Sequence, residues 1–196
     1  SHAEGRQTLA QGESSHAEGR LSTAIGARSH AEGSATASGY TSHAEGDATL
    51  AQGDYSHSEG YNTTAGGQYS HAEGQQATAI GIASHAEGQL TISSGSYSHT
   101  EGSGSIAIGI ASHAEGELTT ASGSNSHAEG RSTRALGDYS HAEGCNTLSV
   151  GYGSHSEGYL TTAIGNFGSH AEGNETTAIG NASHAEGNQT TAIGIA

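Results

Sequence analysis

The sequence predicts an all-β fold, a parallel β-roll or β-solenoid of 14 coils, with about 14 residues and two short strands in each coil. The pentapeptide Ser-His-x-Glu-Gly occurs 14 times in 196 residues, so the chain is built from one short repeat. Of the 32 glycines, 28 fall at only two positions of this repeat. A fixed short period is typical of solenoids and fibres. We therefore expect residues 1–196 to form a single continuous repeat array, an excerpt of a longer fibre protein.

The first strand of each coil is expected at repeat positions 1 to 5, counted from the serine, as in residues 1–5. Ser, Ala and Gly alternate there with His and Glu, and a period of two is the pattern of a strand. The middle position is Ala in 11 units and Ser58, Thr100 or Ser156 in the other three. Because only small residues occur at positions 1, 3 and 5, this face should point into a narrow interior, with His and Glu pointing outward.

The second strand is expected at positions 8 to 12, as in residues 8–12, after a two-residue turn. Its pattern is roughly Thr-x-Ala-x-Gly, in which Thr, Ala and Gly share the inward face. Positions 9 and 11 vary and accept residues as different as Arg134 and Leu136, which predicts a solvent-facing surface. A second turn completes the coil, and only the units 29–41 and 154–168 depart from 14 residues.

The predicted interior consists mostly of methyl and hydroxyl groups. Each buried methylene contributes only about 0.8 kcal/mol, so a single stack of such coils has a weak core. We expect the chain to gain stability by association with other chains.

The composition excludes several classes of partner. The formal charge is −15, from 20 acidic residues against 5 Lys and Arg, so no basic cluster is present to hold nucleic acid or an anionic membrane. The 14 His make this charge sensitive to mildly acidic pH, since full protonation would bring it to −1. No apolar stretch reaches membrane-spanning length, and the single Cys145 supports no disulfide framework.

The sequence offers no catalytic constellation. Ser and His are adjacent in every unit, but strand alternation points them to opposite faces, so they do not form a nucleophile–base pair. The carboxylates are spread along the array instead of being paired in a cleft. We predict that the segment is not an enzyme, and we assign it no catalytic residue, no cofactor and no designated metal site.

The alternation Ser-x-Ala-x-Gly, two residues, Thr/Ser-x-Ala-x-Gly resembles the head repeat of YadA-like trimeric autotransporter adhesins and related repeats in phage tail fibres. The run Thr176-Thr177-Ala178-Ile179-Gly180 shows the pattern clearly, and the resemblance covers the whole chain. It implies a left-handed parallel β-roll, a homotrimer, and a role in extracellular attachment. The outward positions of the Ser-led strand are aliphatic in the usual motif but are His and Glu here in every unit, a variant that looks closer to phage and prophage fibres.

The outward His and Glu should form two columns along the array. We favour the interpretation that they pack against neighbouring chains, because positions 2 and 4 never vary while positions 9 and 11 do. Two alternatives are a solvated polar face and a His/Glu-rich metal-binding solenoid, since both residue types are good metal ligands. The predicted inter-chain residues are His2, Glu4, His16, Glu18, His30, Glu32, His43, Glu45, His57, Glu59, His71, Glu73, His85, Glu87, His99, Glu101, His113, Glu115, His127, Glu129, His141, Glu143, His155, Glu157, His170, Glu172, His184 and Glu186.

Aromatic residues recur in the second turn and should line up along one exposed edge. Such an edge could contact sugars or a neighbouring protein, or its rings could simply stack on one another. The residues are Tyr40, Tyr55, Tyr69, Tyr97, Tyr139, Tyr152 and Phe167.

Together these features predict a structural or adhesive segment of a homotrimeric extracellular fibre, either a phage tail fibre or a cell-surface filament. It would act as a rigid shaft or as an attachment head. The alternative is an adhesin head that binds a host matrix protein or glycan through positions 9 and 11 and the turns. In both cases the first partner is the chain itself, with no nucleic acid and no insertion into a membrane.

Overall fold

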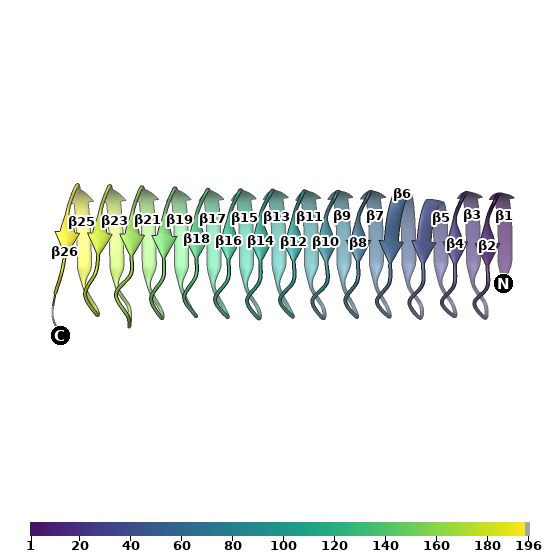
Figure 1. The fold of residues 1–196 in the computed structure, drawn as a ribbon, viewed down its shortest axis with the longest axis horizontal. Coiled ribbons are helices and arrows are strands. Elements are labelled where there is room, and N and C mark those ends of the chain that lie inside the picture. Colours follow the sequence, from purple (N-terminus) through teal and green to yellow (C-terminus); the bar gives the residue numbers. More distant parts are fainter. Residues whose placement is uncertain (195–196) are drawn as a thin grey trace. The chain divides into compact units, whose positions relative to one another are not determined.

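The computed structural model describes residues 1–194, which contain 26 β-strands and no helix. No helix in this part of the chain has the length and apolar character needed to cross a bilayer. The chain divides into two compact units, residues 1–97 and 98–196. Each unit holds seven repeats and is described by itself (Figure 1).

Each coil contributes one longer and one shorter strand, except that the two are merged in the coils that begin at Ser29 and Ser42. In residues 1–97 the longer strands are β1 (His2–Arg6), β3 (His16–Arg20), β5 (His30–Ala37), β6 (His43–Ala51), β7 (His57–Tyr61), β9 (His71–Gln75) and β11 (His85–Gln89), and the shorter ones are β2 (Leu9–Ala10), β4 (Thr23–Ala24), β8 (Thr64–Ala65), β10 (Thr78–Ala79) and β12 (Ile92–Ser93).

The second unit repeats this order. Its longer strands are β13 (His99–Ser103), β15 (His113–Glu117), β17 (His127–Arg131), β19 (His141–Cys145), β21 (His155–Tyr159), β23 (His170–Asn174) and β25 (His184–Asn188), and its shorter ones are β14 (Ile106–Ala107), β16 (Thr120–Ala121), β18 (Arg134–Ala135), β20 (Leu148–Ser149), β22 (Thr162–Ala163), β24 (Thr177–Ala178) and β26 (Thr191–Ala192).

Within each unit, equivalent strands of successive coils pair in parallel and in register. His113 lies opposite His127 and Glu115 opposite Glu129, so every repeat position forms a column along the unit. The shorter strands pair in the same way, with Ala121 opposite Ala135. The predicted all-β parallel solenoid of 14 coils is therefore confirmed.

The interior is lined by the small residues that the alternation predicts at positions 1, 3, 8 and 10, but the prediction is wrong for the position-5 glycines, which are exposed or half-buried because the chain leaves the interior there with a positive φ. Ala114 and Ala121, at positions 3 and 10, are fully buried, as is Thr119 at position 8. Most position-1 serines are also buried and donate their hydroxyls to a nearby glycine carbonyl, as Ser126 does to Gly123 at 2.6 Å, although the buried hydroxyl of Ser29 has no hydrogen-bond partner. These hydrogen bonds satisfy polar groups that the narrow interior would otherwise leave without partners.

The strands begin and end at different residues from those that the sequence predicts. They span positions 2 to 6 and 9 to 10, where the pattern predicts 1 to 5 and 8 to 12. The second strand is short because the N–H groups of positions 11 and 12 both donate to one carbonyl, as Ser122 and Gly123 do to Ala135. Sharing one acceptor bends the chain out of the regular ladder and into the turn.

In most coils, each of the two turns has a non-glycine residue in the left-handed conformation. Leu118 at position 7 has φ of 57° and Asn125 at position 14 has φ of 55°. Their N–H groups donate to Ser103 and Ile110 of the preceding coil, at 2.9 and 2.8 Å. Because this conformation costs an L-residue roughly 1–2 kcal/mol, the ladder bonds between coils must offset it at every turn.

The 13-residue unit has lost its position-7 residue. Ala35 directly follows Ser34, and the two strands of this coil are merged into β5. The strands of the next coil, which pairs with it, are also merged into β6, although Ala48 keeps the left-handed conformation with φ of 58°. The pairing of β5 with β6 shifts register between Ser34 and Thr36, which absorbs the missing residue.

Candidate functional site

In each unit the outward side of the longer strands carries a row of His and Glu, and we call these rows the His–Glu ladder. The parallel register stacks the imidazole rings of successive coils face to face. In residues 98–194 the ring centroids of His113 and His127 are 4.8 Å apart with an interplanar angle of 0°, and those of His127 and His141 are 4.9 Å apart with an angle of 5°. This spacing matches the separation of neighbouring strands in a sheet, so the backbone sets the ring stacking.

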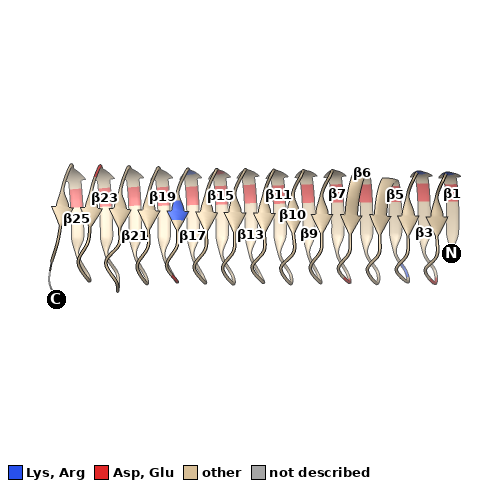
Figure 2. Cartoon of the chain, in the orientation of Figure 1, with Lys and Arg blue, Asp and Glu red and all other residues tan. Residues whose placement is uncertain are grey.

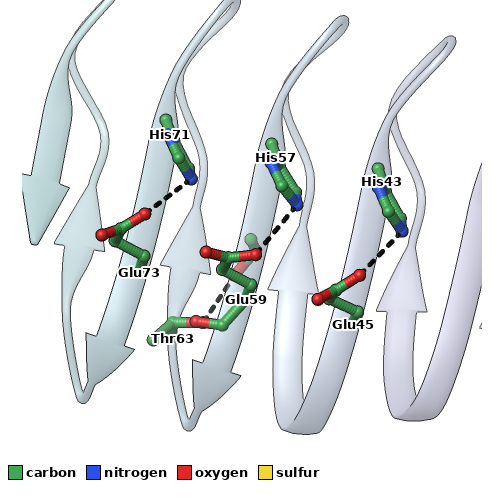
Figure 3. A network of polar contacts seen from close by, with 8 residues as sticks. His43, Glu45, His57, Glu59, Thr63, His71 and Glu73 are labelled. Atoms are coloured by element: carbon green, nitrogen blue, oxygen red, sulfur yellow. Dashed lines mark hydrogen bonds and ion pairs between the residues drawn. The ribbon is translucent and has the colours of Figure 1, made fainter.

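Each imidazole points toward the Glu two residues later in its own strand (Figure 3). The Nε2–Oε2 distance is 3.5 Å for His43 and Glu45, and 3.4 Å for His113 and Glu115. These separations are longer than a good N–H···O hydrogen bond, which is 2.7–3.2 Å. The acidic half of the ladder appears as a red segment in most of the longer strands of each unit (Figure 2).

The ladder is half-buried along its length, and its nitrogen atoms are more enclosed than its rings. The side chains of His113 and Glu115 are 35% and 37% exposed. The Nε2 atom itself is shielded from solvent and makes no hydrogen bond within the chain in His16, His30, His43, His57, His71, His113, His127, His141, His155 and His170. Buried polar atoms in folded proteins nearly always have a hydrogen-bond partner, so this row of nitrogens without one is an unusual feature of the fold.

The environment changes the proton affinity of several ladder residues. Desolvation by burial lowers the pKa of His43, His71, His113 and His170, and the neighbouring imidazoles of the column lower it further. Desolvation raises the pKa of Glu59, opposed by the nearby His57. Both shifts disfavour charge on the ladder.

The melting temperature is expected to fall by several degrees as the pH is lowered from 8 to 5. A lowered histidine pKa means that the folded chain binds fewer protons than the unfolded chain, so acid favours unfolding. The stability due to the neutral imidazoles is present above about pH 6.5, the ordinary histidine pKa, and is lost as the pH falls through the lowered values. The raised pKa of Glu59 acts in the opposite direction, but it is one group against four. Thermal melts by circular dichroism measure this, and a flat profile between pH 5 and 9 would count against it.

The aromatic residues of the second turn lie on the surface in two runs. Six of the seven predicted residues are exposed, and Tyr40 is half-buried. Tyr55 stacks on Tyr69 with ring centroids 5.2 Å apart, and Tyr40 meets Tyr55 edge-on at 5.5 Å. In the second unit Tyr152 lies 5.2 Å from Tyr139 and 6.1 Å from Phe167. The aromatic rings of the second turn therefore stack on one another and also form an exposed edge.

The shorter strands and the residues that follow them carry a second candidate contact surface, which the sequence predicted to face solvent or a receptor without its apolar character being recognised. Position 11 is aliphatic in eight of the 14 units, and several of these side chains are exposed, including Ile108 at 52% and Ile80 at 53%. We call this row the aliphatic face; its exposed position-11 members are Ile25, Ile80, Ile108, Val150, Ile164, Ile179 and Ile193. Exposed apolar patches commonly mark protein–protein contacts. The signal was present in the sequence, but the variability of position 11 concealed it.

The fold and the two outward surfaces define a class, the parallel β-solenoids whose interior is too small for large side chains. The family described as the YadA head domain repeat matches residues 3–29, 17–36, 44–70, 72–98, 86–112, 101–126, 114–140 and 171–195. These matches cover more than half of the chain, and the chain belongs to this family of repeats. No curated protein matches it.

Proposed function

We propose that the chain is a structural and adhesive segment of a homotrimeric extracellular fibre, in which the His–Glu ladder lies between neighbouring chains. Membership of the YadA head repeat family supports this, because YadA-type heads are trimeric, surface-exposed adhesive domains. The observation that carries the proposal is the occurrence of His and Glu at positions 2 and 4 in all 14 units, with side chains that the single chain leaves partly exposed, at 35% for His113 and 37% for Glu115. A neighbouring chain would cover these exposed faces, while the shielded Nε2 atoms stay turned toward the Glu of their own strand.

A cyclic trimer also gives the aliphatic face a role. In a three-fold assembly each chain meets its two neighbours through two different surfaces. The His–Glu ladder and the aliphatic face are two such surfaces, carried by the longer and the shorter strands of the same coil. Burial of the aliphatic face would contribute about 25 cal/mol per Å² of apolar surface, which the small interior cannot provide.

The segment would serve as a rigid shaft or as an attachment head. Regular repetition of the two surfaces favours the shaft, because no repeat is singled out by an inserted loop. The alternative, an adhesin head that binds a host matrix protein or glycan, would use the exposed turns, where Tyr97 and Phe167 are each 67% exposed. The proposal includes both a phage fibre and a cell-surface filament. That residues 1–196 form a single continuous repeat array is a separate prediction.

Substitution of three consecutive ladder histidines should weaken the trimer. We expect His113→Ala, His127→Ala and His141→Ala in combination to shift the chain toward the monomer mass of 19.5 kDa, because three stacked rings leave the interface. Light scattering over a concentration series measures the mass, and circular dichroism checks that the strands persist.

The matched control changes the first turn of the same three coils, which belongs to neither proposed contact surface. Leu118→Ala, Ser132→Ala and Asn146→Ala replace position-7 residues, a position that Ala48 occupies in another coil, and leave the ladder intact. If this control dissociates the trimer while the histidine variant does not, the interface does not lie on the His–Glu ladder.

A further inference from the structure

We propose that the His–Glu ladder binds divalent transition-metal ions, best matched by Zn²⁺, each held by the His and Glu of one coil and the His of the next coil. Two clear examples are His43–Glu45–His57 in the first unit and His113–Glu115–His127 in the second. In each group the three ligand atoms all lie within 4.8 Å of one another. Two imidazoles and one carboxylate, with a fourth position open to water, are a common ligand set for zinc.

The His and Glu of one coil are already placed as a chelating pair. Their Nε2–Oε2 distance is 3.4 Å in His113 and Glu115, and 3.5 Å in His43 and Glu45. Two ligands at about 2.0–2.2 Å from a tetrahedral ion lie about 3.3–3.6 Å apart, so this pair fits with little rearrangement. The Nε2–Oε2 separation is too long for a good hydrogen bond, but it suits two ligand atoms that bind the same ion.

The third ligand requires a movement of both rings. The rings of His113 and His127 are parallel with centroids 4.8 Å apart, whereas two nitrogens on one tetrahedral ion lie about 3.3–3.4 Å apart. The two rings must tilt toward each other so that both Nε2 lone pairs point at the same ion. The Nε2 atoms of both residues have no hydrogen bond to break within the chain, so the movement sacrifices no existing bond.

Shared ligands set the number of ions. His113 belongs both to His99–Glu101–His113 and to His113–Glu115–His127, yet its Nε2 can bind only one ion. Neighbouring groups therefore cannot both be filled, and each ion occupies two coils. Within itself a unit of seven coils holds at most three ions, so the ions held within single units number at most six.

This inference shares residues with the proposed trimer but does not rest on it, because all three ligands of each site come from one chain. The test is equilibrium dialysis of the full chain against zinc chloride, with the bound metal measured by mass spectrometry. We expect about six ions per chain, and a zinc X-ray absorption spectrum with two imidazole nitrogens and one carboxylate oxygen at about 2.0–2.2 Å.

The decisive variant replaces the seven ladder carboxylates of the second unit with Gln, which keeps their size. The changed residues are Glu101, Glu115, Glu129, Glu143, Glu157, Glu172 and Glu186. Bound zinc should fall by half, while the control Glu117→Gln with Glu175→Gln, outside the ladder, should leave it unchanged. One ion per histidine, fewer than one ion per chain, or no loss in the ladder variant would overturn the proposal. Light scattering of the same samples reports the trimer separately, so either proposal can fail alone.

Discussion

Replacement of Gly116 by alanine is expected to lower the melting temperature by about 6–12 °C, from a loss of roughly 3 kcal/mol or more in stability. Gly116 is at position 5 with φ of 107°, a conformation that strains any L-residue. A Cβ at this site would also lie well inside 3.0 Å of the carbonyl oxygen of Gly130 in the next coil. The neighbouring atom is backbone, so relief requires separation of the two coils and loss of their ladder bonds. Thermal melts of the variant and the parent chain measure the effect.

The control for this prediction is Gly153→Ala, in the second turn. Gly153 has φ of 61°, and an added Cβ would meet nothing within 4 Å. Tyr139, at an equivalent turn position, already adopts φ of 58°. We expect a loss of about 1–2 kcal/mol, from the left-handed conformation alone. Equal losses at Gly116 and Gly153 would show that the coils are not packed as closely as described.

Replacement of Ala121 by leucine is expected to be the second most damaging single change. Ala121 is fully buried, and the largest side chains buried to this degree in the described residues are threonines. Overpacking of a well-filled core costs typically 1–3 kcal/mol, and here the Leu side chain has to force apart two sheets that enclose a single layer of small residues. We expect a loss at or above the upper end of that range, measured by thermal or denaturant unfolding.

The neighbouring Thr120 provides the matched control. It lies in the same two-residue strand but points outward, and the same position carries Leu148 two coils later. Thr120→Leu should change stability by less than about 0.5 kcal/mol, as expected for a surface substitution. A similar cost at both positions would contradict the inward and outward assignment of the shorter strand.

The interior was predictable from the sequence because it is set by side-chain volume. Alternation of Ser, Ala and Gly with His and Glu assigns every residue of the first strand to a face, and Ala114 and Ser112 are buried as this predicts. The column arrangement also follows, since a constant repeat length must bring His113 next to His127. These predictions need only strand periodicity and the size of the interior.

The strand ends and the ladder geometry were not predictable in the same way. The ends depend on which carbonyl accepts two N–H groups, as Ala135 does, and composition does not encode that choice. The shielding of Nε2 in His127 follows from ring stacking and from the rotamer that directs it toward Glu129, which only coordinates reveal. The apolar character of the aliphatic face was not recognised from the sequence, because an unvarying repeat position was taken as the sign of a contact. Position 11 varies from coil to coil, yet it often carries an apolar side chain such as Ile108.

The most direct test of the central claim is the mass of the full chain in solution at neutral pH, by light scattering in the presence of a chelator. The chelator removes any contribution of metal ions to association. The trimeric fibre predicts a single species at three times the chain mass of 19.5 kDa, unchanged on dilution. A folded monomer would contradict it and leave the His–Glu ladder and the aliphatic face exposed to solvent.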